Sequence, residues 1–197
     1  MARTRAPRTH AEVVAAAEEF AASVKPGAAQ RDRAGAVPRA EVAEFDSLGL
    51  PAVTVPIDDG GDGLGPRTLA EVIRIVAAAP PALAQTPQGH YLAVDILRLL
   101  GMPLQRARIL PAVVDGARIG PVLAERGGHH AQDLKTRLIR DGARWRLDGT
   151  KYYSTGSLYS DHILVAADQD GVLGGALVIS VGRVAFPEGM LEACPHV

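Results

Sequence analysis

Residues 134–156 read LKTRLIRDGARWRLDGTKYYSTG, and this stretch decides the fold class. Short apolar or alternating runs are separated here by Asp141-Gly142 and Asp148-Gly149. Asp-Gly between such runs is typical of a hairpin turn, because glycine tolerates the positive φ of tight turns. The pattern therefore predicts strands at 134–140, 144–147 and 151–154.

The strand-like pattern extends to both sides of this stretch. It begins near Arg118 and predicts further strands at 119–124, 162–167 and 175–181, the last two separated by Asp170-Gly171. Short connections between strands favour an antiparallel sheet with room to close into a small barrel.

Upstream of Arg118, apolar residues recur at helical spacing. Thr9 and Glu12 are spaced as a capping box and predict a helix start, with an end at Lys25-Pro26-Gly27. We expect further helices from Pro38 to Gly49, from Pro66, over 88–100, and from Pro103, the last kinked or ended early by Pro111. Residues 50–65 are expected to form a long loop with a strand-like start.

Helices followed by strands predict an α+β fold. We expect a helical N-terminal domain over residues 1–117, an antiparallel, barrel-like β domain over residues 118–185, and an atypical tail over residues 186–197.

Composition excludes several classes of function. Lys and Arg number 21 against 22 Asp and Glu, and this balance argues against a nucleic-acid partner. Cys194 is the sole cysteine, so no internal disulfide and no Cys-rich metal site can form. The best apolar run, residues 75–84, contains Pro80 and Pro81 and is half of the ~20 residues that span a membrane. We expect a cytoplasmic protein without a membrane partner, because no apolar signal segment follows the basic start.

Two further motifs favour simple structural interpretations. In the loop Gly60–Gly65, a dinucleotide fingerprint counted from Gly61 would place its third glycine at Pro66, so a turn before a helix is the better interpretation. No two histidines have the i, i+4 spacing of a helical metal site, and His129-His130 follow two glycines, so we expect solvated imidazoles and no metal.

Two other positions leave alternatives open. His90 lies on an apolar predicted helix, where a hydrogen-bonded core histidine is the simple interpretation. Tyr152–Gly156 could line a flat aromatic ligand, but tyrosine and threonine are also favoured in an ordinary half-buried strand. From these residues alone, the ordinary strand is favoured.

Several sequence segments, in their order and spacing, resemble sequences of the acyl-CoA dehydrogenase superfamily. The segments are Leu48–Pro56 with Gly60-Gly61, Gln85–Tyr91, Gly116–Arg126 and Leu147–Gly156. Within the superfamily, Glu125-Arg126 and the ending Tyr153–Gly156 look most like the flavin-dependent sulfur-acquisition oxidoreductases and dibenzothiophene-type monooxygenases.

The resemblance implies a fold and a chain length. Family members have a helical N-terminal domain, a β-barrel middle domain and a C-terminal four-helix bundle. We expect only the first two here, with the bundle absent. Without it, the central helices should expose an apolar patch and the chain should self-associate.

The resemblance also implies a flavin site, with FMN more expected than FAD. Residues Leu123, Ala124, Tyr152, Tyr153 and Ser154 would line the flavin. His90 would be the catalytic residue, because it lies where the monooxygenase branch places an active-site histidine.

Two departures weaken the polar contacts on one side of this implied site. Ala124 stands where a hydroxyl is expected, and Pro121 removes a backbone donor from the same strand.

The activity implied by the resemblance is oxygenation of an organosulfur or similar small substrate by O2 and reduced FMN, which a separate flavin reductase would deliver. The alternatives are an FAD-dependent acyl-CoA dehydrogenase and an inactive remnant or non-catalytic, partner-binding subunit. We expect a homo-oligomer or a complex with a protein partner.

Overall fold

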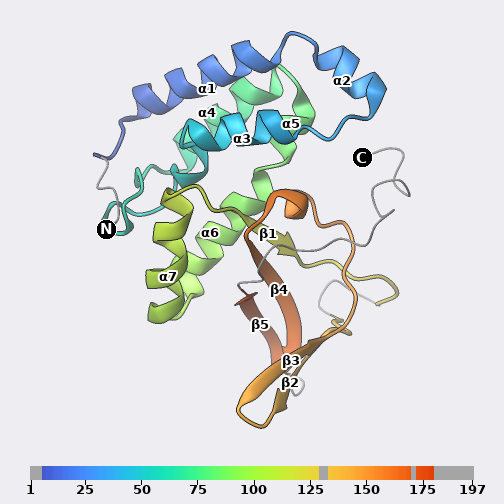
Figure 1. Ribbon diagram of the computed structural model, residues 1–197. Coiled ribbons are helices and arrows are strands. Elements are labelled where there is room, and N and C mark those ends of the chain that lie inside the picture. Colours follow the sequence, from blue (N-terminus) through green and yellow to red (C-terminus); the bar gives the residue numbers. More distant parts are fainter. Residues whose placement is uncertain (1–5, 129–132, 170–171, 180–197) are drawn as a thin grey trace.

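The chain passes from a layer of helices into a sheet, as Figure 1 shows for the computed structural model. The structure describes residues 6–128, 133–169 and 172–179. The α-helices are α1 (His10–Val24), α2 (Ala28–Ala34), α3 (Arg39–Ser47), α4 (Pro66–Ala77), α5 (Pro81–Gln85), α6 (Gln88–Leu100) and α7 (Pro103–Val114). The strands are β1 (Ile119–Val122), β2 (Arg137–Asp141), β3 (Arg144–Asp148), β4 (His162–Gln169) and β5 (Val172–Ile179). This arrangement confirms a mixed α and β fold.

Helix α1 begins at the predicted capping box. The Thr9 amide donates to Glu12 Oε2 at 2.7 Å, and the Glu12 amide donates to Thr9 Oγ1 at 3.3 Å. The predicted apolar face is buried, and its Phe20 ring meets Phe45 of α3 edge-on at 5.2 Å between ring centroids. Helix α1 therefore packs into a first core with α3 and α4.

Helix α6 lies between the two cores and has the predicted bounds. Its Ala93, Val94 and Leu97 pack in a second core with Leu110 of α7 and Ile119 of β1. Burial of each large aliphatic side chain contributes about 1.5–3 kcal/mol, so this core fixes α6 against the first strand.

Several helical predictions need correction. Helix α2 was not predicted because it buries no side chain and so gives no apolar period. The five-residue helix α5, which begins at Pro81, was not predicted either. Helix α7 does not end early, since it runs through Pro111 to Val114. The strand-like start of the 50–65 loop is wrong: 3-10 turns at Leu50–Ala52 and Ile57–Asp59 form instead.

The sheet differs from the predicted antiparallel barrel. Strand β4 pairs in parallel with β1, with Ile119 opposite His162, and also meets β2 in parallel at a single pair, Arg137 opposite Asp168. The β2–β3 and β4–β5 pairs are antiparallel. The described strands form an open, mixed sheet in the order β1-β4-β2-β3, with β5 beside β4. Two long connections, after β1 and after β3, allow the parallel pairing that short hairpins would exclude.

The predicted turns have different outcomes. The Asp141-Gly142 hairpin is confirmed, with Gly142 at φ 60°. The strand expected at 151–154 is wrong, since only a bridge between Ala124 and Tyr152 forms there. The Asp170-Gly171 turn, His129-His130 and the 186–197 tail lie outside the described residues.

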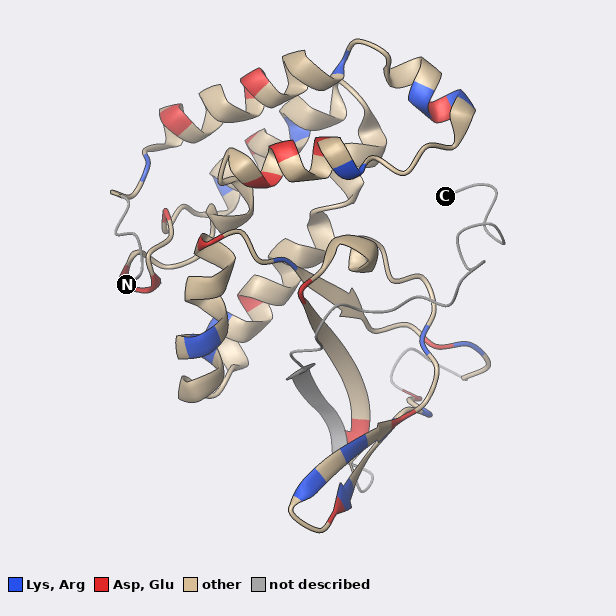
Figure 2. Cartoon of the chain, in the orientation of Figure 1, with Lys and Arg blue, Asp and Glu red and all other residues tan. Residues whose placement is uncertain are grey.

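Charge is unevenly distributed over the fold. Figure 2 shows acidic positions in red along α1 and α3, whereas the β2–β3 hairpin at the far end carries several basic positions in blue beside a few acidic ones. Among the helices that the structure describes, none combines the length and apolar character needed to cross a bilayer.

Candidate functional site

The two segments predicted to line a ligand meet directly in the structure. The Tyr152 amide donates to the Ala124 carbonyl at 3.0 Å, in an antiparallel bridge. The Lys151 ammonium donates to the Leu123 carbonyl at 3.2 Å. Residues 123–124, which follow β1, therefore lie beside residues 151–152, although 26 positions separate Glu125 from Lys151. The fold thus brings together Leu123, Ala124 and Tyr152, the predicted residues at the centre of the site.

Tyr153 adopts an unusual backbone conformation at this bridge. Its φ is 58°, and no other described residue apart from glycine has a positive φ. Its side chain is 76% exposed. A left-handed conformation costs a non-glycine residue about 1–2 kcal/mol, so surrounding contacts must hold Tyr153 in place.

Arg126 supplies such contacts. Its guanidinium carbon lies 4.3 Å from the Tyr152 ring centroid and 5.1 Å from that of Tyr153. Nη2 of Arg126 also donates to the Tyr153 hydroxyl at 3.0 Å. The result is an exposed aromatic and cationic surface, which suits a flat, electron-rich ligand. Arg126 was not predicted as a site residue, although the Glu125-Arg126 dipeptide is part of the family resemblance.

Ser154 lies in a turn that packs against the start of α6. Its carbonyl accepts from the Ser157 amide at 3.1 Å. Gly156 has a φ of 83°, and a Cβ there would lie 2.7 Å from the Thr86 carbonyl oxygen, so glycine is required by both conformation and space. In the same region, a Cβ on Gly89 would collide with the Pro121 ring. These close approaches join the Tyr152–Gly156 turn, α6 and β1.

His90 lies in the protein interior with both ring nitrogens bonded. The Ile119 amide donates to Nδ1 at 3.0 Å, which places the proton on Nε2, and Nε2 in turn donates to the Pro51 carbonyl at 3.1 Å. Burial, assisted by the positive charge of Arg118, lowers the pKa of His90 to about 3. The ring is therefore neutral and joins α6 to β1 and to the loop before α4.

Arg118 anchors the same junction to the helices. Its Nε donates to Asp46 Oδ1 at 2.7 Å, and its guanidinium lies 5.4 Å from the centroid of the Phe45 ring. Its amide donates to Asp161 Oδ2 at 3.0 Å. Burial raises the pKa of Asp46, although Arg118 opposes this shift. The start of β1 is thus attached to α3 and to the segment before β4.

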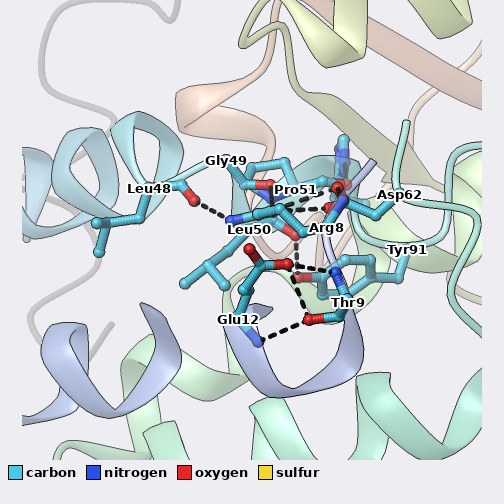
Figure 3. Close-up of polar contacts among 10 residues, drawn as sticks. Arg8, Thr9, Glu12, Leu48, Gly49, Leu50, Pro51, Asp62 and Tyr91 are labelled. Atoms are coloured by element: carbon cyan, nitrogen blue, oxygen red, sulfur yellow. Dashed lines mark hydrogen bonds and ion pairs between the residues drawn. The ribbon is translucent and has the colours of Figure 1, made fainter. Parts of the chain in front are cut away.

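A second polar cluster holds the loop around Leu50 and Pro51, whose Pro51 carbonyl is the partner of His90 (Figure 3). Arg8 contacts Asp62 through Nη2 at 2.7 Å, and it donates to the carbonyls of Leu48 and Gly49 at 2.7 and 2.8 Å. The Tyr91 hydroxyl donates to the Leu50 carbonyl at 2.9 Å. Burial raises the pKa of Tyr91, so this hydroxyl stays protonated. Arg8 and Asp62 were not predicted, because 54 positions separate them and no local pattern links them.

The described residues contain no group of three or more His, Cys, Asp or Glu side chains that could hold a metal ion. An open depression of about 550 Å³ lies between α4 and α6, away from the predicted flavin residues. The residues that line it are Pro66, Leu69, Ala70, Ile73, Arg74, Gln88, Tyr91, Leu92 and Asp95.

The turn between α6 and α7 exposes several large apolar side chains. Leu99, Leu100, Met102 and Leu104 are each more than 60% exposed. Contiguous exposed apolar patches beyond a few hundred Å² mark contact surfaces or aggregation sites. The exposed patch expected on the central helices is present at this turn.

Comparison with known proteins gives consistent relatives. Residues 7–117 match the family model described as the acyl-CoA dehydrogenase N-terminal domain. The chain is 30% identical to the probable acyl-CoA dehydrogenase FadE25 of Mycobacterium tuberculosis, over 83% of this chain and 43% of that protein. It is 28% identical to the dibenzothiophene monooxygenase of Rhodococcus erythropolis, over 93% of this chain and 44% of that protein.

Solved structures add a flavin-bound relative. The FMN-bound TdsC from Paenibacillus sp. A11-2 superposes with a TM-score of 0.72 and 26% identity, over 84% of this chain and 42% of that one. The chain therefore spans less than half the length of the relatives that it matches.

Proposed function

This chain belongs to the acyl-CoA dehydrogenase family, and on that premise we propose that it binds a flavin and takes part in flavin-dependent oxidoreduction. The specific form of the proposal is a monooxygenase-type reaction: reduced FMN from a separate flavin reductase, together with O2, oxygenates an organosulfur or similar small substrate. The bridge between Ala124 and Tyr152 carries this proposal, because it joins both predicted flavin segments in a chain that resembles an FMN-bound protein.

The residues around this bridge fit an isoalloxazine ring. The exposed Tyr153 ring offers a face for stacking, and the hydroxyl of Ser154 and nearby backbone groups offer polar contacts. Leu123 and Ala124 would give apolar contacts along one edge. The flavin would supply the redox chemistry, while these residues would bind and orient it. Ala124 and Pro121 leave fewer donors on that edge than the family pattern would.

His90 has two candidate roles in this proposal. A catalytic role in oxygen chemistry would require Nε2–H to leave the Pro51 carbonyl and face a ligand. The two backbone bonds of the ring instead favour a positioning role, in which His90 holds β1 against α6. The variant His90→Ala distinguishes the two: lost product formation with unchanged FMN affinity would indicate catalysis, and weakened FMN affinity would indicate positioning. Unchanged product formation by folded protein would remove His90 from catalysis.

The first experiment is a flavin titration with the full chain. FMN and FAD are titrated separately, and flavin fluorescence and the visible absorption band are followed. The expected result is saturable binding, tighter for FMN than for FAD. Absence of binding to either flavin, in protein shown to be folded by circular dichroism, would refute the proposed function. If FMN binds, product formation from dibenzothiophene with a flavin reductase and NADH tests the monooxygenase form.

A second candidate function is an FAD-dependent acyl-CoA dehydrogenase. The observation in its favour is the 30% identity to FadE25, whose name describes a probable acyl-CoA dehydrogenase. The discriminating measurement is anaerobic addition of a short acyl-CoA to protein loaded with FAD. Bleaching of the flavin absorption would favour the dehydrogenase function. Unchanged absorption would argue against it and favour the monooxygenase function.

The exposed turn between α6 and α7 supports a contact with another protein surface. We propose that Leu99, Leu100, Met102 and Leu104 are covered in a homo-oligomer or by a protein partner. A chain that serves only as a non-catalytic, partner-binding subunit would use the same surface. Size-exclusion chromatography with light scattering tests self-association, and a stable monodisperse monomer would contradict it.

A further inference from the structure

A buried ion pair joins the two proposed flavin segments. Nζ of Lys151 lies 2.6 Å from Oε1 of Glu125, and the two side chains are 8% and 7% exposed. Lysine and glutamate are rarely so buried unless paired, because removing both charges from water costs several kcal/mol. The contacts of this pair indicate what its two charges stabilise.

The hydrogen bonds of Glu125 link the pair to the sheet. Oε2 accepts from the Lys135 amide at 2.5 Å, and Oε1 accepts from the Thr136 amide at 3.0 Å. The Thr136 carbonyl in turn accepts from the Asp168 amide of β4 at 2.8 Å. Burial opposes ionisation of Glu125, but these bonds and Lys151 outweigh it and lower its pKa to about 2. The carboxylate therefore stays charged and bonded at any physiological pH.

The bonds of Lys151 reach the other side of the site. Its ammonium donates to the Leu123 carbonyl at 3.2 Å, while the amide of the next residue, Tyr152, donates to the Ala124 carbonyl at 3.0 Å. Two successive carbonyls are thus held by two successive residues of the opposite segment. This double attachment sets both the register and the orientation of the segments.

We propose that Lys151 and Glu125 are positioning residues, which hold residues 123–124 in register with Tyr152 so that both segments present one surface to the flavin. The inference rests on the proposed function for its ligand. Both side chains are nearly buried, so they act through Leu123, Ala124 and Tyr152. Their removal should weaken flavin binding through misalignment, more than through general loss of stability.

The first test compares FMN affinity among variants at a temperature well below every unfolding midpoint. Lys151→Met and Glu125→Gln are expected to weaken FMN binding roughly tenfold or more, as loss of a supporting contact behind a binding site commonly does. Lys151→Arg keeps the charge and should recover part of the affinity. The control is Arg31→Met, which breaks a partly buried ion pair with Glu41 between α2 and α3, outside the candidate site, and should leave FMN affinity within twofold. Affinity within twofold of wild type in folded Lys151→Met would overturn the proposal.

The second test uses no flavin. Amide hydrogen exchange, followed by mass spectrometry, reports on the amides of Lys135, Thr136 and Tyr152 in the free protein. Faster exchange at these amides in Lys151→Met and Glu125→Gln, but not in Arg31→Met, is the expected result. Unchanged exchange would overturn the positioning role even if flavin affinity fell. If the wild-type chain binds neither FMN nor FAD, the proposed function fails, and the exchange data alone decide whether the pair orders the two segments.

Discussion

The buried His90 makes the stability of this protein depend on pH in a calculable way. The pKa of His90 falls from 6.5 to about 3 on folding, because burial disfavours the imidazolium and Arg118 adds to the effect. Below pH 6.5 the unfolded chain binds a proton at this position that the folded chain does not bind. Unfolding is therefore favoured progressively as the pH falls from 6.5 towards 3. Between pH 7 and pH 5, this one group should lower the free energy of unfolding by about 2 kcal/mol.

The perturbation that isolates this effect is His90→Gln. A glutamine amide can still donate towards the Pro51 carbonyl, but it does not titrate, and the Ile119 amide loses its acceptor. The variant should therefore be less stable than wild type by about 1–3 kcal/mol at pH 7. The gap should narrow by about 2 kcal/mol at pH 5, because only the wild type loses the contribution of His90.

Urea unfolding at pH 7 and pH 5, at fixed ionic strength and followed by circular dichroism, measures both quantities. Burial also lowers the pKa of His162, so the wild-type slope alone is not sufficient, and the difference between the two proteins is the quantity to compare. Parallel pH dependence of wild type and variant would refute the reasoning, since it would mean that His90 is protonated or solvated in the folded state.

Three other substitutions test separate parts of the structure. Arg8→Met removes the guanidinium from the fully buried Asp62 carboxylate and should cost about 3–5 kcal/mol in urea unfolding; a loss below about 1 kcal/mol would contradict the buried pair. Gly89→Ala places a methyl group against the Pro121 ring and should cost about 1–3 kcal/mol, visible as a lower thermal midpoint, whereas a neutral result would mean that α6 and β1 are farther apart. Tyr153→Gly relieves the left-handed strain and should raise the free energy of unfolding by up to about 1–2 kcal/mol while weakening FMN binding. If Tyr153→Gly greatly lowered the free energy of unfolding and left FMN affinity unchanged, both the strain at Tyr153 and its role in FMN binding would be contradicted.

The helical half of the fold was largely predictable because its signals are local. The capping box of Thr9 and Glu12 and the proline at the first position of α4 each act within one turn, and both were found where expected. Helix α2 escaped prediction because it lies on the surface and buries no side chain. A helix without a buried face leaves no apolar period to recognise.

The sheet was less predictable because strand pairing is not local. Alternating residues indicate that β1 and β4 are strands, but nothing in either segment says that Ile119 pairs in parallel with His162. The parallel order arises because the 3-10 turn at Ser157–Tyr159 lies beside β1 and brings the chain back in the same direction. The hairpin at Asp141-Gly142, whose turn is local, was predicted correctly.

The residues of the candidate site were also only partly predictable from the sequence. Family resemblance placed Leu123, Ala124 and Tyr152 in one site, and the structure brings them together. The buried partners Lys151 and Glu125 were not predicted as site residues, because their roles depend on contacts between segments that are 26 positions apart.

The contacts of Arg118 and Ile119 determine whether the protein can be divided into fragments that fold separately. The change from helices to strands near residue 117 invites expression of the two halves as separate fragments. Such a cut would leave the ring of His90 without the Ile119 amide and the Asp46 carboxylate without Arg118. The halves therefore depend on each other energetically, and heat or denaturant should melt them in a single cooperative transition. Neither half is expected to be a self-sufficient folding unit, even though each looks separate in a diagram of the chain.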